Sequence, residues 1–346
     1  MKERIDYIDG LRGLAIILVI LYHAFARWPE LVPYGGAYSE YALVKHGWLG
    51  VELFFIISGF VILLTLERSK SFSQFLFKRF IRLFPAMFIC TIIIYITLPF
   101  FNERPLGEAN LFSILPGLTF IEPRWWEFIL GFEIKPLEGS FWTLYVEVKF
   151  YLISGLLFFA FSRNTMILTL SFLFLLQGIS SYFLENTFVF FVNRLLNLFS
   201  ISYFGWFSAG AAFYVYFSEK NKKFLILGFT ISFISLLLIE NLSLNLFFYA
   251  LIIVGFFKVA LLSSFVRQAL SNKILLIIGS ISYPLYLLHE NIMISLIIKQ
   301  GKIFGDLYPL SYMLLPIVFL VPLSYFIARY FEPSFRELIL KFISLK

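Results

Sequence analysis

Long uninterrupted apolar runs recur along the whole chain, and they limit its fold more than any other feature of the sequence. With 60% hydrophobic and 14% charged residues and a mean hydropathy of +0.87, the 346 residues carry more apolar surface than a water-soluble core can bury. Most runs are roughly 17–25 residues long, which suits a helix that crosses a bilayer. They lack strand-like alternation, and lipid offers backbone groups no partners, so we predict an all-α integral membrane protein and exclude a barrel.

We predict about ten transmembrane helices from the lengths of these runs. The predicted spans lie near residues 12–28, 47–66, 83–101, 140–161, 165–184, 198–217, 224–239, 243–262, 275–298 and 310–331. The first run is expected to be retained rather than cleaved as a signal peptide, because many similar runs follow and no small-residue cleavage site precedes Arg27. The sequence shows no internal repeat, so residues 1–346 are predicted to form a single membrane domain without a fused soluble domain.

The basic residues predict the orientation of the chain in the membrane. Lysine and arginine are concentrated in the segments on the same side as the N-terminus, so the N- and C-termini are both predicted to be cytoplasmic. Because the basic residues sit at helix ends rather than in one patch, topology explains the net charge of +7 better than nucleic-acid binding does. The single cysteine, Cys90, excludes an intrachain disulfide or a cysteine-based metal site, and we predict no metal.

The longest polar interruption, residues 102–139, is predicted to lie outside. It contains several prolines and the pair Trp125 and Trp126, so it is too aromatic to be a simple linker. Tryptophan rings favour the headgroup region, so an interfacial anchor is one interpretation of this segment. A role in binding an acceptor is the other.

Three ionisable residues are predicted to reach a similar depth inside the membrane. His23 lies eleven residues after Arg12, or roughly 16 Å along a helix, near the middle of a core about 30 Å thick. Glu147 and His289 reach a comparable outer-central layer from two other helices. Intramembrane ionisable groups are costly and often functional, so these three predict a general base with its partners. The alternative is that each is a structural hydrogen-bonding group between helices.

A basic cluster is predicted at the cytoplasmic surface. Arg79 and Arg82 are three residues apart and share a helix face, and Arg12 begins the first span. Guanidinium groups match phosphate oxygens, so these arginines predict a site for a polyanion. The ordinary excess of cytoplasmic basic residues is the alternative explanation for the same pattern.

Five motifs in chain order resemble those of the membrane acyltransferase 3 family, bacterial proteins that acylate surface saccharides. They are Tyr7-Ile8-Asp9-Gly10-Leu11-Arg12-Gly13-Leu14-Ala15 with His23, Gly50-Val51-Glu52-Leu53-Phe54-Phe55-Ile56-Ile57-Ser58-Gly59-Phe60, Arg79-x-x-Arg82-Leu83 with Pro85, Phe141-Trp142-Thr143-Leu144-Tyr145-Val146-Glu147, and Ser282-Tyr283-Pro284-Leu285-Tyr286-Leu287-Leu288-His289. Together they cover most of the chain. Many family members carry an additional soluble esterase-like domain. Because no such domain is predicted here, this chain is expected to act alone or with a separate partner.

The resemblance implies a bacterial inner-membrane O-acetyltransferase that uses acetyl-CoA or another acyl-CoA as donor. Its acceptor would be a hydroxyl of a cell-surface or lipid-linked saccharide, lipopolysaccharide among the candidates. Arg12, Arg79 and Arg82 would hold the phosphates of CoA in the cytoplasmic mouth. His23 would be the general base, Glu147 would orient or charge-pair it, and His289 would position a reactant. Trp142, Tyr145 and Tyr286 would offer surfaces and hydroxyls to the sugar.

Two other functional classes remain open on the sequence alone. A transporter or flippase of a glycolipid or acylated precursor would also need buried charges along a path, although no pair of broken helices in matching halves is evident. A structural or sensory membrane protein would need no chemistry at all. Loss of surface acylation in a His23→Ala variant distinguishes the enzyme from the sensor, and donor-independent movement of a glycolipid across vesicles would indicate the transporter.

Overall fold

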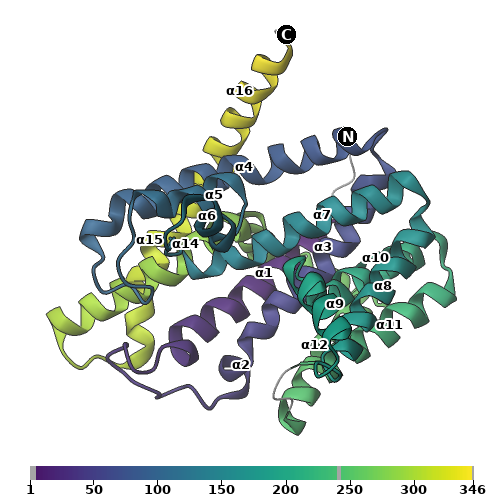
Figure 1. The fold of residues 1–346 in the computed structure, drawn as a ribbon. Helices are drawn as coiled ribbons and strands as arrows, with labels where there is room; N and C mark the ends of the chain where they lie inside the picture. Colours follow the sequence, from purple (N-terminus) through teal and green to yellow (C-terminus); the bar gives the residue numbers. More distant parts are fainter. Residues whose placement is uncertain (1–4, 240–242, 345–346) are drawn as a thin grey trace. The chain divides into compact units, whose positions relative to one another are not determined.

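Every regular element in the described part of the chain, residues 5–239 and 243–344 of this computed structural model, is helical (Figure 1). The all-α prediction is therefore confirmed. The α-helices are α1 Asp6–Tyr22, α2 Ala42–Lys45, α3 Gly50–Glu67, α4 Phe72–Thr97, α5 Ile114–Thr119, α6 Pro123–Leu130, α7 Trp142–Ala160, α8 Arg163–Ser180, α9 Thr187–Leu198, α10 Phe204–Glu219, α11 Lys222–Leu237, α12 Leu244–Leu262, α13 Ser264–Leu270, α14 Lys273–Phe304, α15 Leu314–Phe326 and α16 Glu332–Ser344.

Several of these helices begin where the sequence supplies a capping side chain. The Ser162 hydroxyl accepts a hydrogen bond from the Thr165 amide at the start of α8. The Asn272 side chain accepts one from the Leu275 amide at the start of α14. Serine and asparagine satisfy otherwise unpaired amides at such positions, so these residues fix where each helix begins.

Within residues 5–239 and 243–344, six helices are long and apolar enough to cross a membrane by length and composition. They are Asp6–Arg27, Gly47–Glu67, Phe72–Phe100, Gly139–Ala160, Lys273–Phe304 and Pro309–Phe342. Two sharply bent pairs, Thr187–Leu198 with Ile201–Glu219 and Leu246–Leu262 with Ser264–Leu270, raise the number to eight if each pair is one span. The segments expected at 165–184 and 224–239 form α8 and α11, which are not among the helices that qualify. The total of ten therefore stays a prediction.

The chain divides into two compact units, each of which is described separately. Unit 1 takes in the described residues of Met1–Leu11, Val51–Lys78 and Val146–Ser271. Within it, α10 packs against α8 and α11 (Figure 1), and α3 approaches α10 at two glycines. A Cβ on Gly59 would meet the carbonyl oxygen of Phe207, and one on Gly210 would meet that of Ile56. Small residues allow such close backbone contact between membrane helices.

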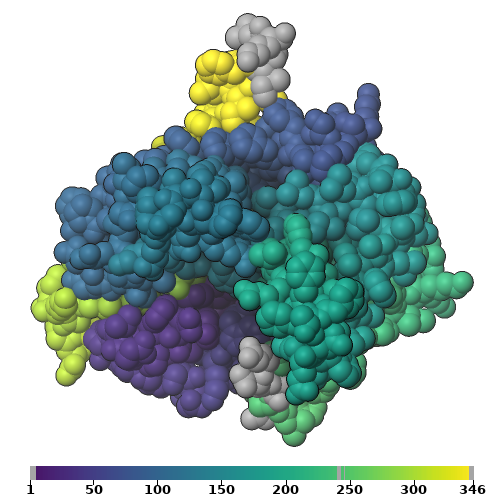
Figure 2. All heavy atoms as spheres, in the orientation of Figure 1, coloured from purple at the N-terminus to yellow at the C-terminus, as the bar shows by residue number. Residues whose placement is uncertain are grey.

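Unit 2 takes in the described residues of Arg12–Gly50, Arg79–Tyr145 and Asn272–Lys346. The long helix α14 is its best-covered span, with 83% of the apolar window buried. It packs against α15 and against the π-helical turn η1, His23–Arg27, that continues α1. Helix α16 projects from this unit (Figures 1 and 2). The close contact of Gly13 with the carbonyl oxygen of Leu275 brings the first span against α14.

The predicted outer segment is folded rather than extended. It contains the short helices α5 and α6, and α6 lies on the face of unit 2 that is turned toward the viewer in Figure 2. Phe128 of α6 is 84% exposed and Ile129 is 62% exposed. Such exposed apolar side chains suit burial in an interfacial lipid layer, which agrees with the anchoring interpretation of this segment.

Candidate active site

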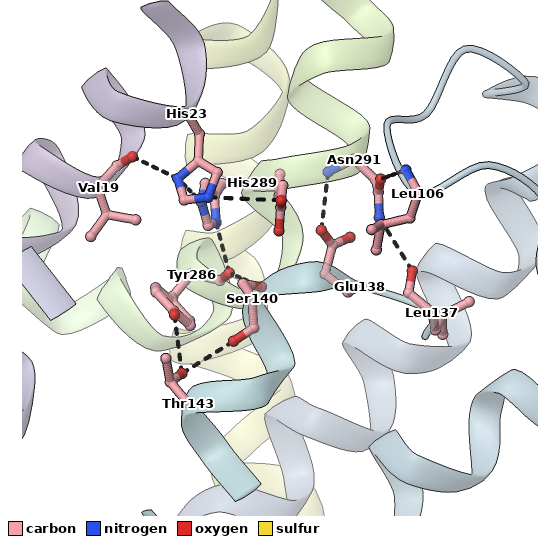
Figure 3. Close-up of polar contacts among 11 residues, drawn as sticks. Val19, His23, Leu106, Leu137, Glu138, Ser140, Thr143, Tyr286, His289 and Asn291 are labelled. Carbon is pink, nitrogen blue, oxygen red and sulfur yellow. Dashed lines mark hydrogen bonds and ion pairs between the residues drawn. The ribbon is translucent and has the colours of Figure 1, made fainter. Parts of the chain in front are cut away.

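The two candidate histidines lie in contact inside unit 2 (Figure 3). His23 begins η1, a π-helical turn of a kind that often occurs at functional sites. His289 lies within α14, and its Nε2 is 3.3 Å from Nδ1 of His23. The ring centroids are 4.7 Å apart and the rings are nearly perpendicular. The two histidines, which helical rise places at a similar depth in separate spans, therefore lie side by side in the fold.

Backbone carbonyls determine which ring nitrogens carry hydrogens. His289 Nδ1 lies 2.8 Å from the carbonyl oxygen of Tyr286, which can only accept, so Nδ1 donates and Nε2 carries a lone pair. His23 Nδ1 lies 2.9 Å from the carbonyl oxygen of Val19, so it too is a donor, shared with Nε2 of His289. The neutral His23 ring is thus left with a lone pair on Nε2.

A carboxylate that the sequence analysis did not assign a role faces this nitrogen. The Oε1 atom of Glu290 is 3.8 Å from Nε2 of His23. The carboxylate also lies against the backbone of Gly139, where a Cβ would be 2.4 Å from Oε2 of Glu290. A glycine at 139 therefore leaves the room in which Glu290 approaches His23.

Exposure separates the roles of the two histidines. The side chain of His23 is 14% exposed, whereas His289 is 0% exposed. The side chain of His23 thus keeps some exposed surface, and its Nε2 makes no hydrogen bond within the described part of the chain, whereas both ring nitrogens of His289 are engaged. His289 thus contacts His23 directly, and its predicted role in positioning a reactant stays a prediction.

The predicted sugar-binding aromatics lie in different environments. Tyr286 is buried, its hydroxyl accepts a hydrogen bond from Thr143 at 3.0 Å, and its ring lies 5.4 Å from that of His289. Ser140 donates to the carbonyl oxygen of the same tyrosine at 3.1 Å, a network that is visible in Figure 3. Tyr145 is also buried, whereas Trp142 is 40% exposed. Of the three, Trp142 is the one accessible to a large ligand.

A second polar cluster adjoins the histidines through Asn291, the residue after Glu290. The amide of Asn291 donates to Oε1 of Glu138 at 3.1 Å, and its side chain donates to the carbonyl oxygen of Leu137 at 3.2 Å (Figure 3). The same carbonyl accepts from Nη2 of Arg104. Burial and the charge of Glu290 raise the pKa of Glu138 well above its ordinary value.

Glu147 lies in unit 1, within α7. Its Oε1 accepts hydrogen bonds from the hydroxyls of Ser58 at 2.5 Å and Tyr151 at 2.6 Å. These contacts join α7 to α3 inside the unit, so Glu147 has a structural task there. Its predicted role as partner of His23 stays a prediction.

The basic cluster contains one acidic partner that the sequence analysis did not identify. Arg12, Arg79 and Arg82 are all half-buried residues of unit 2. Arg82 lies 3.5 Å from Glu332 and its guanidinium lies over the ring of Tyr283. Arg336 lies 3.8 Å from the same carboxylate. Two arginines therefore share one carboxylate. The predicted binding of an anion by this cluster stays a prediction.

An imidazole nitrogen with a lone pair and a carboxylate 3.8 Å away is an arrangement that can serve general-base catalysis. Comparisons with known proteins indicate the class of reaction. The sequence model of the family described as an acyltransferase domain matches residues 5–329. The chain belongs to this acyltransferase family, and its apolar helices describe a multi-pass membrane protein.

The named relatives are bacterial and much longer than this chain. It is 31% identical over 164 residues to the peptidoglycan O-acetyltransferase OatA of Listeria monocytogenes, covering 44% of this chain and 24% of that protein. It is 30% identical over 159 residues to an O-acetyltransferase OatA of Staphylococcus aureus, covering 42% of this chain and 23% of that protein. A third protein, provisionally named an O-acetyltransferase of S. aureus, is 25% identical over 324 residues, which are 82% of this chain and 49% of that one. No solved structure matches the chain.

Proposed function

We propose that the chain transfers an acetyl group from acetyl-CoA to a hydroxyl of a cell-envelope saccharide, at a site inside the bacterial inner membrane. The observation that carries this proposal is the imidazole of His23, whose Nδ1 contacts His289 and whose Nε2 faces Glu290. Membership of the acyltransferase family and the names of the relatives support the reaction class.

His23 acts as general base in the proposed step. Its Nε2 takes the proton of the acceptor hydroxyl while the oxygen attacks the thioester carbonyl. The tetrahedral species then collapses to the ester, the carbon–sulfur bond breaks, and the imidazolium returns its proton to the departing CoA thiolate. Glu290 stabilises the imidazolium, and at about 4 Å with an effective dielectric of 20 this attraction amounts to roughly 4 kcal/mol. Direct transfer and transfer through an acyl-histidine both use this nitrogen.

The donor site is proposed from charge. The phosphates of CoA would be held by Arg12, Arg79 and Arg82 on the predicted cytoplasmic side, with Arg336 close by. The narrow pantetheine arm would then carry the thioester toward His23. The electrostatic part of this binding should weaken as salt concentration rises, because salt screens charges that are only partly buried.

Binding of acetyl-CoA to the purified, detergent-solubilised protein tests the donor. We expect His23→Ala to bind it as the wild type does, and an Arg79→Ala/Arg82→Ala variant to bind it at least roughly tenfold more weakly, since charged hydrogen bonds contribute about 1.5–3 kcal/mol each. No binding to folded wild-type protein removes acetyl-CoA as donor. Glycolipid movement across vesicles without any acyl donor would instead favour the transporter.

A further inference from the structure

Arg104 is a buried cation with unused hydrogen-bond donors next to the candidate active site. It is 6% exposed, and among the described residues Nη2 is the one side-chain nitrogen with an acceptor, the carbonyl oxygen of Leu137. Its Nε and Nη1 atoms are buried and meet no acceptor among the described residues. The charges of Glu138 and Glu290 attract this guanidinium, but buried donors that make no hydrogen bond still cost free energy, so an arginine retained in this state calls for an explanation.

Glu138 has the complementary property. It is 1% exposed, and its Oε1 is fixed by the amide of Asn291. Its Oε2 is buried and unpartnered within the described part of the chain. Asn291, the residue after Glu290, connects both groups. Its backbone amide binds Glu138, and its side chain shares the carbonyl oxygen of Leu137 with Arg104.

These contacts place the cluster directly beside the proposed general base. Asn291 follows Glu290 in α14, and Gly139, which follows Glu138, lies against the Glu290 carboxylate. Glu290 in turn faces Nε2 of His23 at 3.8 Å. Glu290 therefore contacts both the proposed general base and the segment that carries Glu138.

We infer that Arg104 and Glu138 form the subsite that binds a second hydroxyl of the acceptor saccharide. The guanidinium can only donate, whereas a carboxyl can accept, and also donates when it is protonated. A sugar hydroxyl both accepts and donates, so it satisfies both groups at once, whereas an acyl carbonyl oxygen can only accept. Arg104 also belongs to the segment predicted to lie outside, the side from which an envelope saccharide would arrive.

This inference rests on the proposed function, and acceptor kinetics test it. The acceptor probe is envelope saccharide extracted from the source cells and stripped of ester-linked acetate by mild base, with labelled acetyl-CoA as donor. We expect Arg104→Gln to raise the KM for this saccharide roughly 10-fold to 100-fold, because it removes charged hydrogen bonds. Acetyl-CoA binding should stay within about twofold of the wild type. Lys45→Gln, which removes an exposed cation of the same unit, is the matched control and should leave both values unchanged.

A second variant keeps the test decisive if Arg104→Gln does not fold. Glu138→Gln retains an oxygen for the Asn291 amide and should raise the saccharide KM about 3-fold to 10-fold. Residues that bind the same hydroxyl should show non-additive effects in the double variant. An unchanged saccharide KM in folded variants, or an equal loss of acetyl-CoA binding, would overturn the subsite alone. Folded wild-type protein that transfers no acetate to the saccharide would overturn the proposed function and the subsite together.

Discussion

At the scale of single residues, the arrangement assigns different tasks to groups of the same type. The side chain of His23 is 14% exposed and has a lone pair on Nε2, whereas His289 is fully buried and contacts the ring of His23. Glu290 faces His23, and Glu138 is fixed by the Asn291 amide. The proposed roles of base, orienting group and charge partner therefore follow from position relative to neighbouring groups rather than from residue type.

The charge partner can be tested by an isosteric change. Glu290→Gln keeps the shape of the side chain but removes the charge that stabilises the His23 imidazolium, so we expect the rate of transfer to fall roughly 100-fold while acetyl-CoA binding is retained. Single-turnover transfer in membrane vesicles measures this rate. A Glu290→Gln variant with wild-type transfer would show that Glu290 is only a structural neighbour.

A pH dependence of stability is expected from Glu138. Burial and the nearby charge of Glu290 raise the pKa of Glu138 well above its ordinary value of 4.5, so the folded state holds this proton more tightly than the unfolded state. The resulting stabilisation is complete below about pH 4.5 and is lost as the pH rises through the folded-state pKa. Glu138→Gln cannot lose a proton, so its stability relative to the wild type should increase from about pH 5 to pH 8.

Thermal unfolding in detergent across this range measures that difference. Glu40→Gln, which removes an exposed carboxylate, is the control for a general charge effect. A difference between wild type and Glu138→Gln that stays constant with pH would contradict the expected protonation of Glu138.

The sequence could place His23 and His289 at one depth, because a helix rises by a fixed 1.5 Å per residue. It could not single out Glu290 as the partner of His23. Depth says nothing about which way a side chain points around the helix axis, and Glu147 reaches the same predicted layer. Arg104 and Glu138 were missed for another reason: they lie outside the apolar runs, where no periodicity fixes a position.

At the scale of elements, unit 1 depends on close helix packing at glycine. Gly59→Ala would put a Cβ 1.9 Å from the carbonyl oxygen of Phe207, so α3 and α10 would have to separate. We expect a loss of about 2 kcal/mol or more in stability, in the range of overpacked cores. Gly255→Ala in α12 is the matched control, because its Cβ would meet no atom within 4 Å. It should be neutral or stabilising by up to about 1 kcal/mol.

Thermal unfolding of the two purified variants provides the comparison. Equal stability of Gly59→Ala and the wild type would show that the α3–α10 contact is looser than described.

The existence of the helices was predictable because the apolar runs are long, and their starts are marked by capping residues such as Asn272. The 71° bend between α9 and the helix Ile201–Glu219 was not predictable, because no proline or glycine marks that break.

At the scale of the whole molecule, the orientation predicted from the basic residues remains to be measured. In a Cys90→Ala background, Glu108→Cys lies in the segment predicted to be outside, and Lys341→Cys lies near the predicted cytoplasmic end. We expect a membrane-impermeant maleimide to label Glu108→Cys in spheroplasts, and Lys341→Cys only after permeabilisation, as the excess of basic residues in the predicted cytoplasmic segments implies. The opposite pattern would invert the topology and place the proposed CoA site outside the cell.

The most direct test of the account is acetyl transfer by His23→Ala in membrane vesicles, measured together with its binding of acetyl-CoA. The account predicts that binding is retained within about twofold, whereas transfer to the envelope saccharide falls by roughly 100-fold to 10,000-fold, the usual contribution of a general base. Transfer at the wild-type rate would contradict the account, because Nε2 of His23 would then have no part in the reaction.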